Sequence, residues 1–177
     1  MFEFMGTASN RNNIDCFMYN IILMGVSGCG KTTIGEQLAD KLGIPFYDGD
    51  DFHPEKNVEK MQSGEPLNDQ DRLPWLVKLA EQISLMNREG GGVIACSALK
   101  QAYRNILIGA PGADVTFVYL KGDQELIADR LSEREDHYMP ADLLDSQFDD
   151  LEEPEDAITV SIDQEPDEIV DEIFDRL

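Results

Sequence analysis

The chain lacks any apolar run long enough to cross a membrane, which takes about 18 residues. Residues 1–20 also lack the basic start and following apolar stretch of a secretory signal. We therefore expect no membrane partner. We interpret residues 1–17 as an N-terminal extension, and we expect one folded domain over residues 18–177.

Basic residues are scarce, because 14 lysines and arginines stand against 36 acidic residues and the net charge is −22. A surface of this sign repels nucleic acid, so nucleic acid is not an expected partner. A site for anionic substrates needs local positive charge, which makes the position of each base informative. The bases that fall within the motifs described below are Lys31, Arg72, Lys100, Arg104, Arg130 and Arg134.

Cysteine is rare as well. The three cysteines, Cys16, Cys29 and Cys96, have no spacing typical of a metal site. An odd number of cysteines suggests free thiols in a reducing compartment, and the cytoplasm is therefore the expected location.

Short apolar runs alternate with segments of helical periodicity. The expected strands are 18–25, 44–47, 93–98, 115–120 and 157–162, and the expected helices are 31–42, 72–88, 99–109, 123–134, 141–151 and 166–177. The helix at 72–88 carries on one side Leu73, Leu76, Leu79, Ile83 and Met86. This alternation predicts an α/β fold of three layers, in which helices flank a parallel five-stranded sheet.

The strongest motif is GVSGCGKT at residues 25–32, between an expected strand and an expected helix. It matches the P-loop, in which glycines turn backbone N–H groups onto a phosphate and the helix adds its positive end. The expected nucleotide-binding residues are Gly25, Val26, Ser27, Gly28, Cys29, Gly30, Lys31 and Thr32. Lys31 would reach the β- and γ-phosphates, and Thr32 would ligate Mg²⁺. Cys29 is either a reactive thiolate or simply a small residue that the loop tolerates.

Acidic residues follow the second expected strand and not the third. Strand 93–98 ends without an acid, and the chain has no guanine-reading Asn-Lys-x-Asp tetrapeptide, so motor ATPases and GTPases are disfavoured. Asp48 and Asp50 stand two apart at a strand's carboxyl end, where open α/β sheets bind ligands. One carboxylate can position Mg²⁺ and the other can accept a proton from a substrate hydroxyl, although an aspartate-rich turn is the alternative.

Several further motifs occur in one order: DGDDFHP (48–54), GEPLNDQDR (64–72), PWL (74–76), CSALK (96–100), YR (103–104), YLKG (119–122) and matching positions within 130–154. Together they resemble the P-loop gluconokinase family over residues 19–177. The resemblance implies a nucleoside-monophosphate-kinase-like fold with a mobile lid over about residues 128–145. It also implies transfer of phosphate from ATP to D-gluconate with Mg²⁺, giving 6-phospho-D-gluconate for the pentose phosphate pathway, and a homodimer.

The same resemblance suggests roles for individual residues. Asp50 is the expected general base, by analogy with the related shikimate kinases, and Asp48 the expected indirect partner of Mg²⁺. The candidates for binding gluconate are Asp50, Arg72, Lys100, Arg104 and His137. Arg130 and Arg134 share a helix face, so one could cover the nucleotide while the other, together with Lys31, acts in catalysis at the transferred phosphate.

Two other functions stay open on the sequence alone. Another kinase of this fold, for shikimate or a nucleoside monophosphate, is the nearest alternative, but shikimate kinases place glycines after the third strand whereas here Gly90, Gly91 and Gly92 precede it. A non-catalytic ATP-binding regulator could dispense with Asp50 and the lid arginines, all of which are present.

Overall fold

The computed structural model describes residues 19–112, 114–132 and 141–177, and it places five strands in one sheet. The strand order is β2-β3-β1-β4-β5, and every neighbouring pair is parallel. The strands are β1 Tyr19–Met24, β2 Phe46–Asp48, β3 Gly91–Ala95, β4 Val115–Lys121 and β5 Ile158–Ser161. The predicted parallel five-stranded sheet is confirmed.

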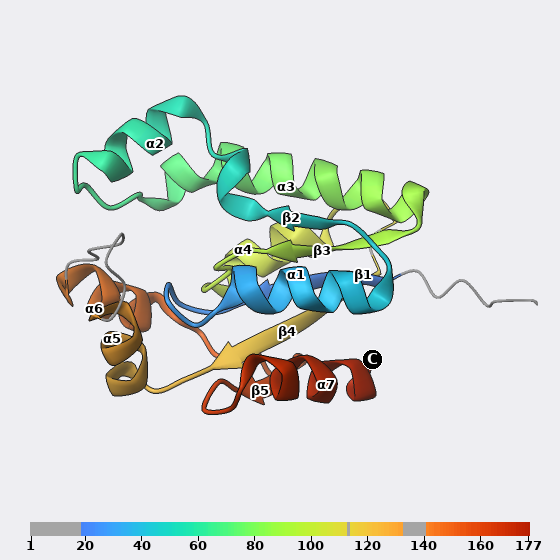
Figure 1. Cartoon of the computed structure of the whole chain (residues 1–177). Helices are drawn as coiled ribbons and strands as arrows, with labels where there is room; N and C mark the ends of the chain where they lie inside the picture. The colour runs from blue at the N-terminus through green and yellow to red at the C-terminus, as the bar shows by residue number, and fades with distance from the viewer. Residues whose placement is uncertain (1–18, 113, 133–140) are drawn as a thin grey trace, which may run out of the picture.

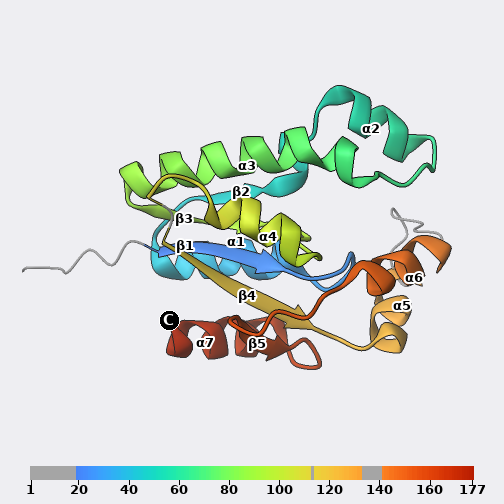
Figure 2. The same cartoon turned by 180° about the vertical axis from the view of Figure 1, so that it is seen from behind.

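Helices cover both faces of this sheet (Figures 1 and 2). Helices α1 and α7 pack on one face and α3 and α4 on the other, whereas α2, α5 and α6 lie near the carboxyl ends of the strands. The helices are α1 Lys31–Leu42, α2 Glu55–Gln62, α3 Asp69–Glu89, α4 Gln101–Ile108, α5 Gln124–Ser132, α6 Ala141–Asp150 and α7 Pro166–Arg176. The predicted three layers are therefore present.

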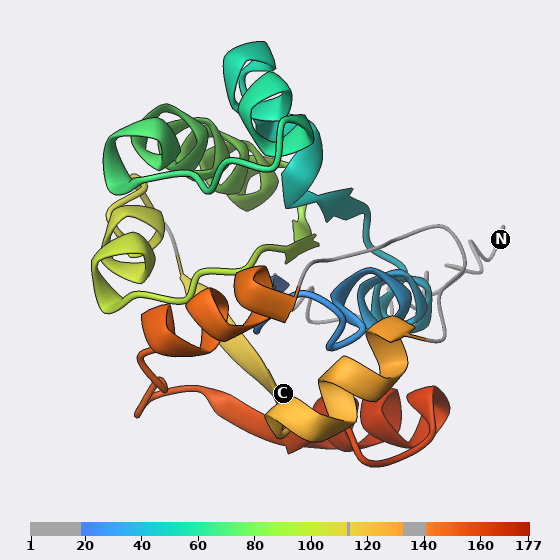
Figure 3. The ribbon, with the colours of Figure 1, turned by 90° about the vertical axis from the view of Figure 1, so that its left-hand side faces the viewer.

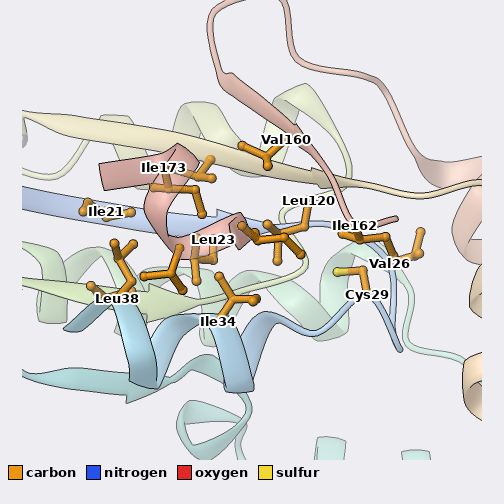
Figure 4. Close-up of a cluster of buried hydrophobic side chains, with 14 of the residues drawn as sticks. Ile21, Leu23, Val26, Cys29, Ile34, Leu38, Leu120, Val160, Ile162 and Ile173 are labelled. Atoms are coloured by element: carbon orange, nitrogen blue, oxygen red, sulfur yellow. The ribbon is translucent and has the colours of Figure 1, made fainter. Parts of the chain in front are cut away.

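The central strand β1 is buried on both faces, which explains its unbroken apolar run. Ile21 and Leu23 join the cluster beneath α1 and α7, which Figure 4 shows, while Ile22 and Met24 join the cluster beneath α3 and α4. Since β1 leads directly into residues 25–30, this double burial gives the phosphate loop a rigid base.

Two of the three consecutive glycines lie within β3. Helix α3 ends at Glu89 with Gly90 as its C-cap, and β3 begins at Gly91, two residues before the predicted start. Gly91 has φ 103°, and a Cβ there would lie 2.4 Å from the carbonyl oxygen of Tyr19. The glycine thus permits a close approach of two strands, a requirement that apolar periodicity does not reveal.

Helix α3 begins three residues before the predicted start at residue 72. Asn68 caps it, because its Oδ1 accepts from the N–H of Asp71 at 2.9 Å while Asp71 accepts from the N–H of Asn68 at 3.1 Å. The prediction was wrong for Leu73, which is 49% exposed. Trp75 is 2% exposed and belongs to the core.

Helix α2 was not predicted, and its sequence explains why. Of its eight residues only Asn57 is buried, so it shows no apolar stripe for a pattern to detect. Polar contacts hold it to the start of α3. Nδ2 of Asn57 donates to the carbonyl oxygen of Asp71 at 2.7 Å, and Nζ of Lys60 lies 2.7 Å from Oδ2 of Asp71.

The predicted extension over residues 1–17 lies outside the described residues, as do residues 133–140 within the predicted lid. The extension and the lid therefore stay predictions. Among the described residues, none of the helices has the length and apolar character that a membrane crossing requires.

Candidate active site

The phosphate loop connects β1 to α1 at the carboxyl end of the sheet, which faces the viewer in Figure 3. Gly25, Gly28 and Gly30 adopt positive φ angles of 145°, 84° and 97°, which let the chain turn tightly. Cys29 is buried beneath the loop and points into the core with Val26 (Figure 4). This burial favours Cys29 as a small packing residue over a reactive thiolate.

Lys31 bends back over the loop that precedes it. Its Nζ donates to the carbonyl oxygens of Gly25 at 3.0 Å and Val26 at 2.9 Å. The ammonium group is thus held beside the main chain that a P-loop wraps around phosphates. The role of Lys31 at the phosphates stays a prediction.

Thr32 and Asp48, the two residues predicted to serve a metal ion, are in direct contact. The hydroxyl of Thr32 donates to Oδ2 of Asp48 at 3.1 Å. Asp48 ends β2, and its Oδ1 accepts from the N–H of Asp50 at 3.1 Å, so the same carboxylate also caps the short 3₁₀ turn Gly49–Phe52. One side chain therefore connects the start of α1 to the turn that carries Asp50.

Asp50 presents its carboxylate to solvent, with 88% of the side chain exposed. Although the side chain is exposed, the surrounding protein removes part of its hydration and raises its pKa, the charge of Asp48 raises the pKa further, and the charge of Lys31 lowers it. A carboxylate with a raised pKa is a stronger base than an ordinary aspartate, which suits it to accept a proton.

The turn that carries Asp50 rests on an aromatic stack. The rings of His53 and Trp75 lie 4.4 Å apart at an angle of 13°, and Nε1 of Trp75 donates to the carbonyl oxygen of Gly49 at 2.6 Å. Burial of His53, together with the nearby charge of Arg72, lowers its pKa to about 4. His53 is therefore neutral near pH 7, and its Nε2, 3.9 Å from Oδ1 of Asp50, forms no ion pair there.

Arg72 and Lys100, two of the predicted gluconate-binding cations, meet at one carboxylate. Nη1 of Arg72 lies 3.3 Å from Oδ2 of Asp150, and Nζ of Lys100 lies 3.2 Å from Oδ1 of the same residue. Asp69 also accepts from Lys100 at 3.1 Å and from the hydroxyl of Tyr103. The hydrogen bond with Asp69 raises the pKa of Lys100, so the amine stays charged. The structure therefore brings two of the predicted cations together around one carboxylate of the protein.

Arg104, the third predicted gluconate-binding cation, points inward. The residue is 2% exposed, and its guanidinium donates to the main-chain oxygens of Ala98, Leu99 and Glu152 at 2.9 Å each and to the side chain of Gln101. These bonds occupy all five N–H groups that an arginine has. In this conformation Arg104 has no donor left for a substrate and instead supports the loop that carries Lys100.

We predict that Arg104→Met lowers the free energy of unfolding by about 3 kcal/mol, because buried carbonyl oxygens lose their donors. Urea unfolding followed by circular dichroism measures this change. The matched control is Arg88→Met on the exposed end of α3, which should stay within about 0.5 kcal/mol of the parent. If Arg104→Met has the stability of the parent but a raised KM for gluconate, Arg104 binds the substrate and its structural role is refuted.

The remaining predicted residues come from the lid region. Arg130 lies on α5, and its Nη2 donates to the carbonyl oxygen of Ile162 at 2.6 Å. Arg134 and His137 lie outside the described residues, so their roles stay predictions.

Two residues of α6 that carried no predicted role contact the site. Gln147 hydrogen-bonds Ser27 of the phosphate loop, and Asp150 pairs with Arg72 and Lys100. No local pattern could have revealed either contact, because the partners lie far apart along the chain. The position of both within the motif stretch 130–154 was the available signal.

Comparisons with known proteins agree with this geometry. The family model described as "Shikimate kinase" matches residues 27–177. A protein of Xenopus tropicalis named "Probable gluconokinase" is 47% identical over 173 residues, which covers 86% of this chain and 90% of that protein. The "Thermosensitive gluconokinase" of Escherichia coli is 51% identical over 138 residues and covers 77% of this chain and 73% of that protein. A crystal structure of a gluconokinase from Sinorhizobium meliloti superimposes with a TM-score of 0.81 at 40% identity, covering 88% and 89% of the two chains.

Proposed function

Since this chain belongs to the gluconokinase family of shikimate kinase-like P-loop kinases, we propose that it transfers the γ-phosphoryl group of ATP to the 6-hydroxyl of D-gluconate. The products would be ADP and 6-phospho-D-gluconate. One observation carries the proposal beyond the family. The paired cations Arg72 and Lys100 contact Asp150 of α6, and Gln147 of the same helix contacts the phosphate loop, so a candidate carboxylate site and a phosphate site lie along one helix.

The phosphate loop and Lys31 would hold the nucleotide. Backbone N–H groups at the end of the loop and the positive end of α1 attract the phosphates, and Lys31 adds a full charge beside them, while the N–H of Ser27 is bonded to Gln147. Phosphoryl transfer depends mainly on positioning and on neutralising charge. Lys31 would therefore stabilise the charge that develops on the transferred group.

The oxygens of Thr32 and Asp48 fit Mg²⁺, a cation that prefers hard oxygen ligands. The part of the chain that the structure describes holds no group of three or more side chains suited to bind a metal alone. This agrees with Mg²⁺ being held by one or two protein groups, substrate phosphates and water. Thr32 would ligate the ion and Asp48 would orient its water, and the ion would neutralise phosphate charge when bound.

Asp50 would act on the acceptor hydroxyl. As the 6-hydroxyl oxygen of gluconate bonds to the γ-phosphorus, its proton passes to the carboxylate of Asp50. The bond between the γ-phosphorus and the bridging oxygen breaks, and ADP leaves with that electron pair. Asp48 bonds both the hydroxyl of Thr32 and the N–H of Asp50, which places Asp50 near the start of α1 and supports this assignment.

Arg72 and Lys100 would bind the gluconate carboxylate, which can share or displace their partner Asp150. Arg104 is not assigned to the gluconate carboxylate, because its donors are bonded to main-chain oxygens of the protein. Three contacts remain proposals: that of Arg130 with the nucleotide, that of Arg134 with the transferred phosphate, and that of His137 with gluconate.

We predict that Arg72→Gln and Lys100→Met each raise the KM for gluconate about 10- to 100-fold, because a charge-assisted hydrogen bond contributes about 1.5–3 kcal/mol. The KM for ATP should change less than about threefold, since neither residue touches the phosphate loop. Steady-state kinetics with each substrate varied in turn measures the split. Lys78→Met is the control, because Lys78 lies on the exposed side of α3 and its loss changes the net charge equally. An unchanged KM for gluconate in both variants would remove them from the carboxylate site.

The function is tested by coupled measurement of ADP release with a panel of acceptors that includes gluconate, other sugar acids, shikimate and nucleoside monophosphates. Gluconate should give the highest kcat/KM. Turnover with gluconate no greater than with buffer ends the substrate proposal. ATP binding without turnover on any acceptor would favour the non-catalytic regulator.

We also propose a cytoplasmic location and a homodimer. Buried, unpaired Cys29 and Cys96 suit a reducing compartment. The homodimer follows only from the family resemblance, and light scattering coupled to size-exclusion chromatography tests it.

A further inference from the structure

The tip of the phosphate loop is held by a side chain 120 residues further along the chain. The main-chain N–H of Ser27 donates to Oε1 of Gln147 at 2.7 Å, and Nε2 of Gln147 donates to the hydroxyl oxygen of Ser27 at 3.0 Å. Gln147 lies on α6, which crosses the carboxyl ends of the strands beside the loop (Figure 3). One carboxamide thus binds one loop residue at two points.

Helix α5 contacts the next residue of the loop. A Cβ placed on Gly28 would lie 2.8 Å from Cγ of Leu131, so the Leu131 side chain already fills the space beside this glycine. Loop residues 27 and 28 are therefore enclosed by two neighbouring helices, with a polar contact from α6 and an apolar contact from α5.

A phosphate loop binds well only if its N–H groups already have the orientation that the anion needs. A free loop tip would have to be ordered when the nucleotide arrives, and that ordering would reduce the affinity. One hydrogen bond of Gln147 holds the peptide group between residues 26 and 27 and the other holds the side chain of Ser27, next to the glycines that turn the loop.

We propose that Gln147 is a positioning residue for the phosphate loop, which it holds in the conformation that accepts the phosphates of ATP. The inference rests on the proposed function, since it concerns the same nucleotide site. Gln147 acts through Ser27, and its loss should weaken nucleotide binding more than acceptor binding.

The test is the dissociation constant of ATP, measured by titration calorimetry with Mg²⁺ and no acceptor present. Gln147→Met keeps the length of the side chain but removes both hydrogen bonds, and it should weaken ATP binding about tenfold. Ser27→Ala removes only the hydroxyl contact and should cost about threefold. The double variant should bind ATP no more weakly than Gln147→Met alone, because the hydroxyl acts through Gln147.

Gln124→Ala is the matched control, because Nε2 of Gln124 bonds Oδ1 of Asp145 between α5 and α6 without touching the loop. It should leave ATP affinity within about twofold of the parent. Parent-like affinity in Gln147→Met, equal weakening in Gln124→Ala, or additive losses in the double variant would each overturn the proposal. If Gln147→Met does not fold, parent-like affinity in Ser27→Ala overturns it. A parent that binds ATP but does not phosphorylate gluconate refutes only the proposed function.

Discussion

Replacing Asp50 with asparagine is expected to lower kcat about 100- to 10,000-fold, the range over which a positioned general base contributes. Asparagine keeps the shape of the side chain but cannot take the proton of the acceptor hydroxyl. The KM values for ATP and gluconate should change less than about threefold, because the phosphate loop and the cations at Arg72 and Lys100 remain. ADP release at saturating concentrations of both substrates measures the effect.

Two comparisons sharpen the Asp50 test. Asp51→Asn removes the same charge one residue later and should keep most of the activity.

The pH profile gives a second comparison. In the parent, kcat should fall as the pH falls through the pKa of Asp50. Because that pKa is raised, the fall begins above the pH at which an ordinary aspartate of pKa 3.8 would protonate. This acidic limb should disappear in Asp50→Asn. Near-parent kcat in Asp50→Asn would exclude Asp50 as the base.

Replacing Lys31 with methionine is expected to lower kcat about 100- to 1,000-fold, the loss typical when one preorganised group that stabilises transition-state charge is removed. The KM for ATP should also rise, because Lys31 attracts the phosphates in the ground state as well. Methionine retains the apolar stem of the side chain, so the fold should be preserved. Initial rates with ATP varied at saturating gluconate separate the two effects.

Lys41 provides the control for Lys31, since it lies on the last turn of the same helix. It pairs with Asp171 and lies over the ring of Phe174, away from the phosphate loop. Lys41→Met should alter stability slightly and kcat hardly at all. If Lys31→Met retains more than about a tenth of the parent kcat, the charge of Lys31 is not a main source of transition-state stabilisation.

Much of the fold followed from local patterns. Helix α1 has the bounds that its Ile34 and Leu38 spacing predicts, and the glycine pattern places the phosphate loop correctly because the loop is contiguous along the chain. The contact between Thr32 and Asp48 could also be expected from the sequence, because the carboxyl ends of parallel strands converge at one edge of the sheet.

The arrangement around the acceptor cations was less predictable, because it depends on contacts between distant segments. The sequence shows that Arg72, Lys100 and Arg104 are basic but not which way each side chain points. Arg104 turns inward because α4 places it beneath the main-chain oxygens of residues 98, 99 and 152. Asp150 reaches Arg72 from 78 residues away, a pairing that only the fold creates.

The stacked pair of His53 and Trp75 has a practical consequence. The chain contains one tryptophan, so its tryptophan fluorescence arises from a single buried ring. That ring is hydrogen-bonded to Gly49 and lies against an imidazole 3.9 Å from the carboxylate of Asp50. Any rearrangement of this turn therefore changes the surroundings of the indole, which makes the protein an unlabelled optical reporter of movements in the turn that carries Asp50.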